Sequence, residues 1–60
     1  MEYRLLVTNA KGKRLTPTWE GRDPEDAMVR YADTFRDHTV HAWRHVRHGL
    51  FIGMRPSKNG

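Results

Sequence analysis

The chain has 60 residues, contains no cysteine and carries a formal net charge of +4 at pH 7. A chain of this length forms one small domain, and the lack of cysteine excludes disulfides and thiolate metal sites. Its longest apolar runs, residues 5–7 and 50–52, are too short to cross a bilayer as a helix. No signal-peptide pattern follows Met1, so we expect a cytoplasmic protein.

Two segments near the N-terminus, residues 2–8 and 14–20, alternate between apolar and polar side chains. This period of two is typical of strands that are buried on one face. Residues 9–13 between them contain Asn and Gly, which tolerate positive φ, so we predict a β-hairpin. Pro17 has no backbone N–H to donate, which places the second strand at a sheet edge or at a bulge.

The clearest local signal is a helix start. Asp23 is a predicted N-cap, Pro24 fits the first helical position, and Glu25 and Asp26 add negative charge to the first turn. The helix is expected to run from residue 24 to about 37, with Asp26 and Arg30 as a favourable i,i+4 pair. Its apolar stripe at helical spacing consists of Ala27, Met28, Tyr31, Ala32 and Phe35.

Residues 38–48 fit two patterns. As a helix, the segment would align its four histidines, His38, His41, His45 and His48, in one stripe. As a strand, it would place Val40, Ala42, Arg44 and Val46 on one face and His41, Trp43, His45 and Arg47 on the other. The β-branched and aromatic residues favour the strand. His48 and Gly49 then form a turn into a short final strand over residues 50–54.

These elements predict an α+β domain of the order ββαββ, in which one helix packs on one face of a small, mostly antiparallel, four-stranded sheet. Residues 1–54 are expected to form this single domain, and residues 55–60 a flexible tail. The predicted helix-covered face carries Tyr3, Leu5, Val7, Leu15, Trp19, Val40, Ala42, Val46, Leu50, Ile52 and Met54.

A single helix covers only one face of such a sheet, so the other face is the predicted functional surface. That face combines aromatic, cationic and hydrogen-bonding side chains, namely Arg4, Leu6, Thr8, Arg14, Thr16, Thr18, His41, Trp43, His45, Arg47 and Phe51. The leading hypothesis is a non-enzymatic interaction module that binds a protein partner, or itself as a homodimer, through this face. The predicted binding residues are Trp43, Phe51, Leu6, Arg4, Arg14, His41, His45 and Arg47.

Two alternatives use the same surface. A nucleic-acid-binding protein would stack bases on Trp43 and Phe51 while arginines meet phosphates, although no RNA-binding signature is present. A minimal ribonuclease would use His41 or His45 with Arg44 and Arg47 on a phosphate. No nucleophile or cofactor motif accompanies these groups, so neither an enzyme nor a cofactor is predicted, and no small-molecule substrate is evident.

The histidines also raise the question of a metal site. His41 and His45 have the His-x3-His spacing that chelates zinc on a helix. On a strand the same two residues lie about 13 Å apart along the chain, too far for one ion, so no metal site is predicted.

Strict strand alternation puts Arg44 on the helix-covered face, where an unpaired guanidinium is costly. Three solutions are open: pairing with Glu20 or Asp37 at the sheet margin, burial against a partner, or a strand register that differs from simple alternation.

Overall fold

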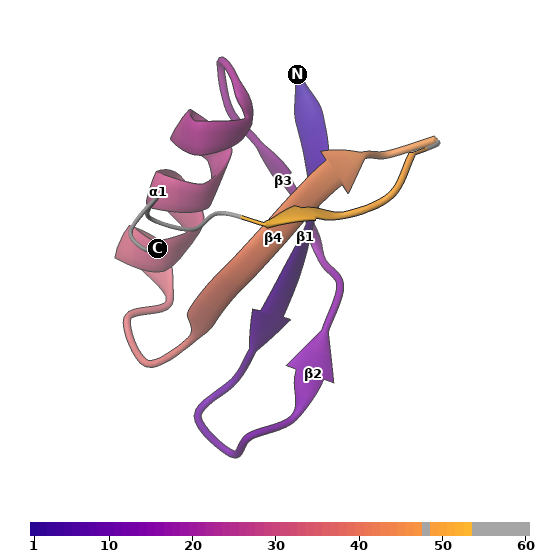
Figure 1. The fold of residues 1–60 in the computed structure, drawn as a ribbon. Helices are drawn as coiled ribbons and strands as arrows, with labels where there is room; N and C mark the ends of the chain where they lie inside the picture. Colours follow the sequence, from indigo (N-terminus) through magenta and orange to yellow (C-terminus); the bar gives the residue numbers. More distant parts are fainter. Residues whose placement is uncertain (48, 54–60) are drawn as a thin grey trace, which may run out of the picture.

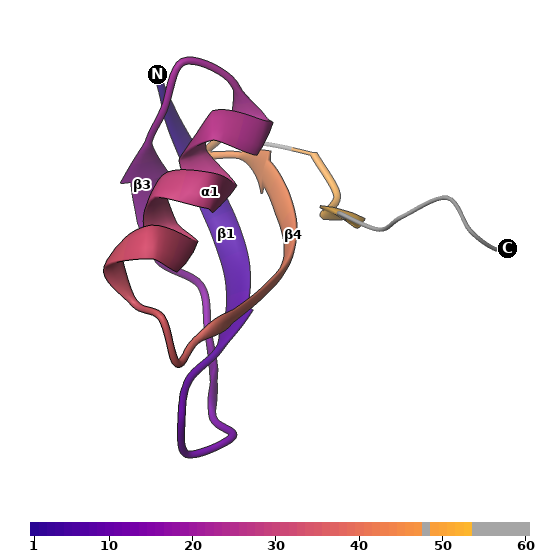
Figure 2. The ribbon, with the colours of Figure 1, turned by 90° about the vertical axis from the view of Figure 1, so that its left-hand side faces the viewer.

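The computed structural model describes residues 1–47 and 49–53. Its elements follow the order β1 (Glu2–Thr8), β2 (Arg14–Leu15), β3 (Thr18–Glu20), α1 (Pro24–Thr34), β4 (Thr39–His45) and β5 (Ile52–Gly53). One helix packs on an antiparallel sheet, as the sequence pattern predicted (Figures 1 and 2). Residues 39–45 are extended, which resolves the ambiguity of the histidine-rich segment in favour of a strand.

The sheet is built around β1, which pairs with β2 and β3 on one side and with β4 on the other, while β5 adds to the far side of β4. The helix α1 packs against β1, β3 and β4 (Figure 2). No helix of the described residues covers the opposite face of the sheet. The layer order therefore leaves one face of β1 and β4 without a helical cover.

The first hairpin has one register across its whole length. Val7 pairs with Leu15, and Arg4 pairs with Thr18, so no residue is inserted between β2 and β3. The interruption lies at Pro17, which cannot donate but still accepts a hydrogen bond of 2.8 Å from the Leu5 N–H. The sequence prediction of an edge strand disturbed by proline is confirmed.

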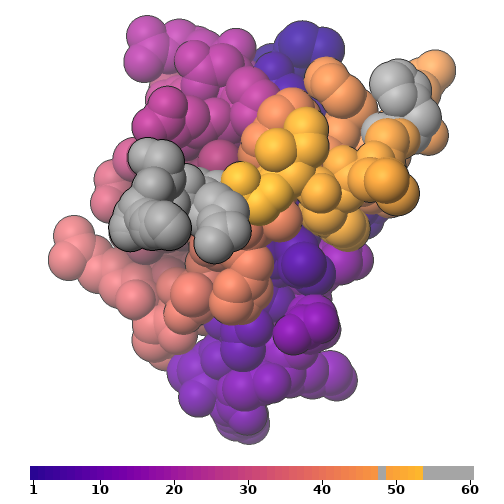
Figure 3. All heavy atoms as spheres, in the orientation of Figure 1, coloured from indigo at the N-terminus to yellow at the C-terminus, as the bar shows by residue number. Residues whose placement is uncertain are grey.

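The hairpin tip is closed by its own side chain. Asn9 Oδ1 accepts hydrogen bonds of 2.9 Å from the backbone N–H groups of Lys11 and Lys13. Gly12 lies between them at φ 82°, a conformation that glycine adopts without strain. Lys11, Lys13 and Arg14 are exposed at or beside this tip. The tip itself lies at the lower end of the views in Figures 1 and 3.

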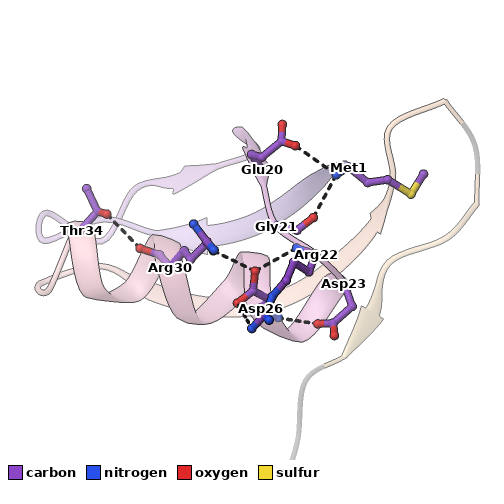
Figure 4. Close-up of polar contacts among 8 residues, drawn as sticks. All are labelled: Met1, Glu20, Gly21, Arg22, Asp23, Asp26, Arg30 and Thr34. Atoms are coloured by element: carbon purple, nitrogen blue, oxygen red, sulfur yellow. Dashed lines mark hydrogen bonds and ion pairs between the residues drawn. The ribbon is translucent and has the colours of Figure 1, made fainter.

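The helix begins as predicted. Asp23 is the N-cap and accepts a 2.7 Å hydrogen bond from the Asp26 N–H, and Pro24 occupies the first turn. Asp26 in turn accepts from the Arg22 N–H and from Arg30 Nε, each at 2.8 Å (Figure 4). The backbone N–H of Arg22 holds the pKa of the Asp26 carboxyl below its usual value, with a further lowering by Arg30 and a partial opposition from desolvation.

The helix ends at Thr34, not near residue 37. Phe35 leaves helical geometry at φ −116° and ψ 82°, and its carbonyl accepts from the His38 N–H at 3.0 Å. This turn brings the chain to Thr39, where β4 begins. Phe35 remains 37% exposed, and Ala32 is exposed too, so the buried stripe is Ala27, Met28 and Tyr31.

The core lies between α1 and the helix-facing side of β1. Leu5 and Val7 are fully buried, and Tyr3, Ala27, Met28 and Tyr31 are nearly so. Leu15, Trp19, Val40 and Trp43 pack against this cluster from its margins. Trp19 meets the Tyr31 ring edge-on at a centroid distance of 5.1 Å, which ties β3 to the helix. Burial of the Tyr31 ring raises the pKa of its hydroxyl.

A β-bulge in β4 changes which of its side chains face the helix. Leu6 pairs with Ala42, but Val7 pairs with Val40, so His41 is an extra residue in β4. Leu5 and Trp43 are partners, as are Tyr3 and His45, so Trp43 and His45 lie on the helix-facing side. Ala42 and Arg44 lie on the opposite side, so the predicted faces of these four residues were wrong.

The C-terminal strand is shorter than expected. The predicted strand over residues 50–54 is reduced to β5, whose Ile52 pairs with Trp43 and Gly53 with Ala42. Leu50 and Ile52 are 88% and 52% exposed, so the prediction that the helix covers them was wrong; β5 lies beyond the reach of α1. His48, Met54 and the tail 55–60 lie outside the described residues. Within the described part of the chain, α1 is too short and too polar to span a membrane.

Gly21, directly after β3, lies close against the backbone of Ala27 in α1. A Cβ atom at this position would lie 2.4 Å from the Ala27 N and 2.6 Å from the Ala27 Cα, both backbone atoms that cannot move aside. The Gly21 N–H donates to the Met1 carbonyl at 2.9 Å, and the Met1 amine donates to the Gly21 carbonyl at 3.0 Å (Figure 4). This glycine therefore fixes the start of the helix against the start of the sheet.

We expect Gly21→Ala to lower the free energy of unfolding by about 1–3 kcal/mol, the usual cost of overpacking, because the added methyl group clashes with backbone atoms. Urea unfolding followed by circular dichroism measures this. The control is Gly12→Asn, because position 12 has open space around it and Asn tolerates positive φ. Equal stability of Gly21→Ala and the parent would contradict the close approach.

The lowered pKa of Asp26 predicts a pH dependence. The ionised carboxylate stabilises the fold above its ordinary pKa of 3.8, and this contribution is lost as the pH falls through the lower folded-state value. Asp26→Asn should thus be less stable than the parent at pH 7, and the difference should shrink below about pH 4. Thermal unfolding between pH 2 and 7 tests this, with Asp33→Asn as a control on the same helix. A difference that does not change with pH would exclude the carboxylate as its cause.

Candidate binding face

The side of the sheet turned away from α1 is called the open face below. Because β1, β2, β3 and β4 are in register, its side chains form rows across the strands. From the N-terminal end of β1 these are the acidic row (Glu2 and Glu20), the arginine row (Arg4 and Arg44), the apolar row (Leu6 and Ala42) and the hairpin row (Thr8, Arg14 and His41). Successive rows are two residues apart along β1, or about 7 Å.

The arginine row carries two cations on neighbouring strands. Arg4 and Arg44 are direct partners across β1 and β4, a pairing that is destabilising for like charges unless a counter-charge is present. Among residues 1–47 and 49–53, no carboxylate lies within ion-pair distance of either guanidinium. Asp26 of the helix pairs with Arg22 and Arg30 instead.

Arg4 is held toward the hairpin side of the open face. Its Nη1 donates a 2.8 Å hydrogen bond to the Thr16 carbonyl. Its Nε is buried and has no hydrogen-bond partner among the described residues. An unsatisfied buried donor costs about 1–3 kcal/mol, so this side chain is kept in place at a cost to the free protein.

Arg44 is held toward the opposite side. Its Nη1 donates to the carbonyls of His45 at 2.8 Å and Val46 at 3.2 Å. Its guanidinium carbon lies 5.4 Å from the centroid of the Phe51 ring, within the range of a cation–π contact. The two arginines thus lean apart and are held by carbonyl oxygens and a ring, which do not neutralise their charge.

Between the arginine row and the hairpin row the surface is apolar, and its side chains are short or absent on β4 and β5. Leu6 is half-buried, and its partner Ala42 is 6% exposed. Gly53 continues this row on β5 without a side chain, because it pairs with Ala42. A narrow apolar strip of Leu6, Ala42 and Gly53 therefore lies between the arginine row on one side and the hairpin row with Arg14 on the other.

The hairpin row contains the extra residue of the bulge. His41 Nε2 and Thr8 Oγ1 are 2.7 Å apart and hydrogen-bonded, which fixes the imidazole over the end of β1. Arg14 pairs with Thr8 in the sheet and is exposed. Beyond it the chain leads into the basic hairpin tip.

The opposite end of the open face is acidic. Glu2 and Glu20 are cross-strand partners, and Glu20 forms a 3.0 Å ion pair with the Met1 amine. A hollow of about 360 Å³ lies nearby, lined by Met1, Glu2, His45, Val46 and Arg47. Arg47 follows the end of β4 and is exposed at this hollow, beyond the rows of the open face.

The predicted binding residues consequently divide into three groups. The structure brings Arg4, Leu6, Arg14, His41 and Phe51 to the open face, but it turns Trp43 and His45 to the helix side. Arg47 lies beyond the rows, at the hollow next to the end of β4. Trp43 meets the Tyr3 ring edge-on at 5.7 Å, and His45 lies 5.3 Å from Trp43. Arg44 was not among the predicted binding residues, although the ribonuclease alternative included it. The cost of burying an unpaired guanidinium was the signal that could have placed it on the open face.

The histidines do not converge on one point. His41 lies on the open face and His45 on the other side of β4, because the bulge separates them. His38 is hydrogen-bonded to the Tyr31 hydroxyl at 2.8 Å, beside the end of α1. Among the residues that the structure describes, no three His, Asp or Glu side chains gather as metal ligands.

These features define a small α+β protein with one helix on one face of an antiparallel sheet and a mostly basic open face on the other. Comparison of the chain with protein-family models, curated proteins and solved structures finds no match.

The two aromatic residues that the sequence assigned to one face should respond differently to truncation. We expect Trp43→Ala to lower the free energy of unfolding by about 2 kcal/mol, less than a fully buried ring, since Trp43 is half-buried against the core. Phe51→Ala should cost less than about 1 kcal/mol, because its described contact is the cation–π interaction with Arg44. Urea unfolding measures both variants. An equal loss for the two would contradict the assigned faces.

Proposed function

We propose that this protein is a non-enzymatic interaction module whose open face binds an acidic segment of a partner protein. The observation that carries the proposal is the Arg4–Arg44 pair, two adjacent guanidiniums without a carboxylate partner among the described residues. Such a pair destabilises the free protein and gains most from a ligand that supplies negative charge. The apolar row beside it offers a surface on which an apolar side chain of the partner would be buried.

Self-association through the open face is less favourable on electrostatic grounds. A dimer with a two-fold axis uses the same patch on both copies. When that axis runs along the strands, the two Arg4–Arg44 pairs lie opposite each other. Four guanidiniums then share a desolvated interface in which the carboxylates of Glu2 and Glu20 lie one row away, and burial of like charges against each other is costly. An acidic partner avoids this cost.

Binding of single-stranded nucleic acid loses part of its support once the faces are assigned. Base stacking needs exposed rings, each worth about 1–3 kcal/mol per base. Trp43 packs against the core, and Phe51 already lies beneath Arg44. Phosphate contacts to the arginines remain available, so an oligonucleotide belongs in the test as a competing ligand.

The test uses two fluorescent probes of equal charge, a ten-residue polyglutamate peptide and an oligodeoxythymidine. Fluorescence anisotropy at low salt gives the affinity for each. We expect the peptide to bind, and Arg4→Gln/Arg44→Gln to weaken it about tenfold, which equals 1.4 kcal/mol and matches the loss of two partly exposed ion pairs.

The matched control is Arg22→Gln/Arg36→Gln, which removes the same charge outside the open face. This variant should retain nearly the parent affinity. Equal weakening in the two double variants would mean that only net charge matters and would reject the open face as the site. Tighter binding of the oligonucleotide than of the peptide would reject a protein partner in favour of nucleic acid. A dimer seen by light scattering and disrupted by Arg4→Gln/Arg44→Gln would reject it in favour of a second copy of the chain.

A further inference from the structure

The spacing of the rows defines the partner segment more closely, an inference that rests on the proposed function. From Arg4 to Thr8 along β1 there are four residues, or about 14 Å. Arg14 is the partner of Thr8, and Arg44 is the partner of Arg4, so a cation stands at each end of this distance. The apolar row lies midway, at Leu6 and Ala42.

We propose that the open face recognises an extended acidic segment in which two carboxylates flank one apolar side chain at alternate positions. In an extended chain, residues i, i+2 and i+4 point to the same side and span about 14 Å. The first carboxylate would meet the arginine row, the apolar side chain the apolar row, and the second carboxylate Arg14. The period of the ligand thus matches the period of β1.

The middle position favours an apolar side chain with room to approach. Ala42 carries only a methyl group and Gly53 carries no side chain, while Leu6 provides apolar surface beside them. A cationic or strongly polar residue at this point would lose water without gaining a partner. A leucine in the segment would gain buried apolar area instead.

The ends of the open face orient the segment. Glu2 and Glu20 lie one row beyond the arginine row, so a third carboxylate at that end would be repelled. At the other end, Lys11 and Lys13 extend the positive charge past Arg14. Additional acidic residues are therefore favoured only on the side of the hairpin tip.

The experiment compares two seven-residue peptides of identical composition, with Glu, Leu and Glu among four serines. In the first, the three residues occupy alternate positions; in the second, the two glutamates are adjacent and the leucine is last. Titration of the ¹⁵N-labelled protein followed by amide chemical shifts gives both affinities. We expect the alternating peptide to bind about fivefold more tightly, the factor that one well-placed ion pair contributes.

Arg14→Gln identifies the second anchor. This variant should weaken the alternating peptide about fivefold and remove its advantage over the permuted peptide. Lys11→Gln, which removes the same charge at the hairpin tip, should leave the advantage in place. Amide shifts of residues 4–8 and 39–44 should move with the alternating peptide, whereas those of α1 should not.

The outcomes separate the two proposals. If both peptides bind equally and in a manner that depends on Arg4 and Arg44 alone, the spacing inference is overturned while the proposed function stands. An alternating peptide whose advantage survives Arg14→Gln overturns it as well. If no acidic peptide binds, the proposed function fails, and the inference that rests on it fails with it.

Discussion

The extra residue at His41 determines what each side of this molecule presents. A β4 without the bulge would turn Arg44 toward the core and Trp43 toward solvent. The two-to-one pairing opposite Leu6 and Val7 reverses the outcome for the rest of the strand. It places a large apolar ring against Tyr3 and Leu5, and it leaves the guanidinium where water reaches it. Because burial of an unpaired arginine is costly and burial of tryptophan is favourable, both residues stabilise this register.

Local signals explain which elements could be predicted from the sequence. The start of α1 depends on Asp23 and Pro24, residues whose cap geometry is set within a few positions of the chain. The first hairpin likewise depends on local alternation and on Asn9 and Gly12 in its turn. The end of α1 depends instead on where β4 must begin, which is a tertiary requirement. Sequence periodicity alone therefore placed that end too late.

The binding face was predictable only in part, for the same reason. Arg4, Leu6 and Arg14 lie on strands whose alternation is unbroken, so their side was correctly inferred. Trp43 and His45 follow the bulge, and a shift of one residue moves each of them to the other face. Nothing in the sequence around Gly21 indicates that the backbone of Ala27 approaches it so closely.

The size of the domain connects the core to the open face. One helix of 11 residues shields the helix-facing side of β1, β3 and β4, and the remaining side must be compatible with water. Charged and polar residues satisfy that requirement. Asp26 forms ion pairs with Arg22 and Arg30, and Glu20 forms an ion pair with the Met1 amine. These two carboxylates are thus engaged away from the arginine row, and the positive charge of Arg4, Arg44 and Arg14 lies on the face where a partner of opposite sign would gain most.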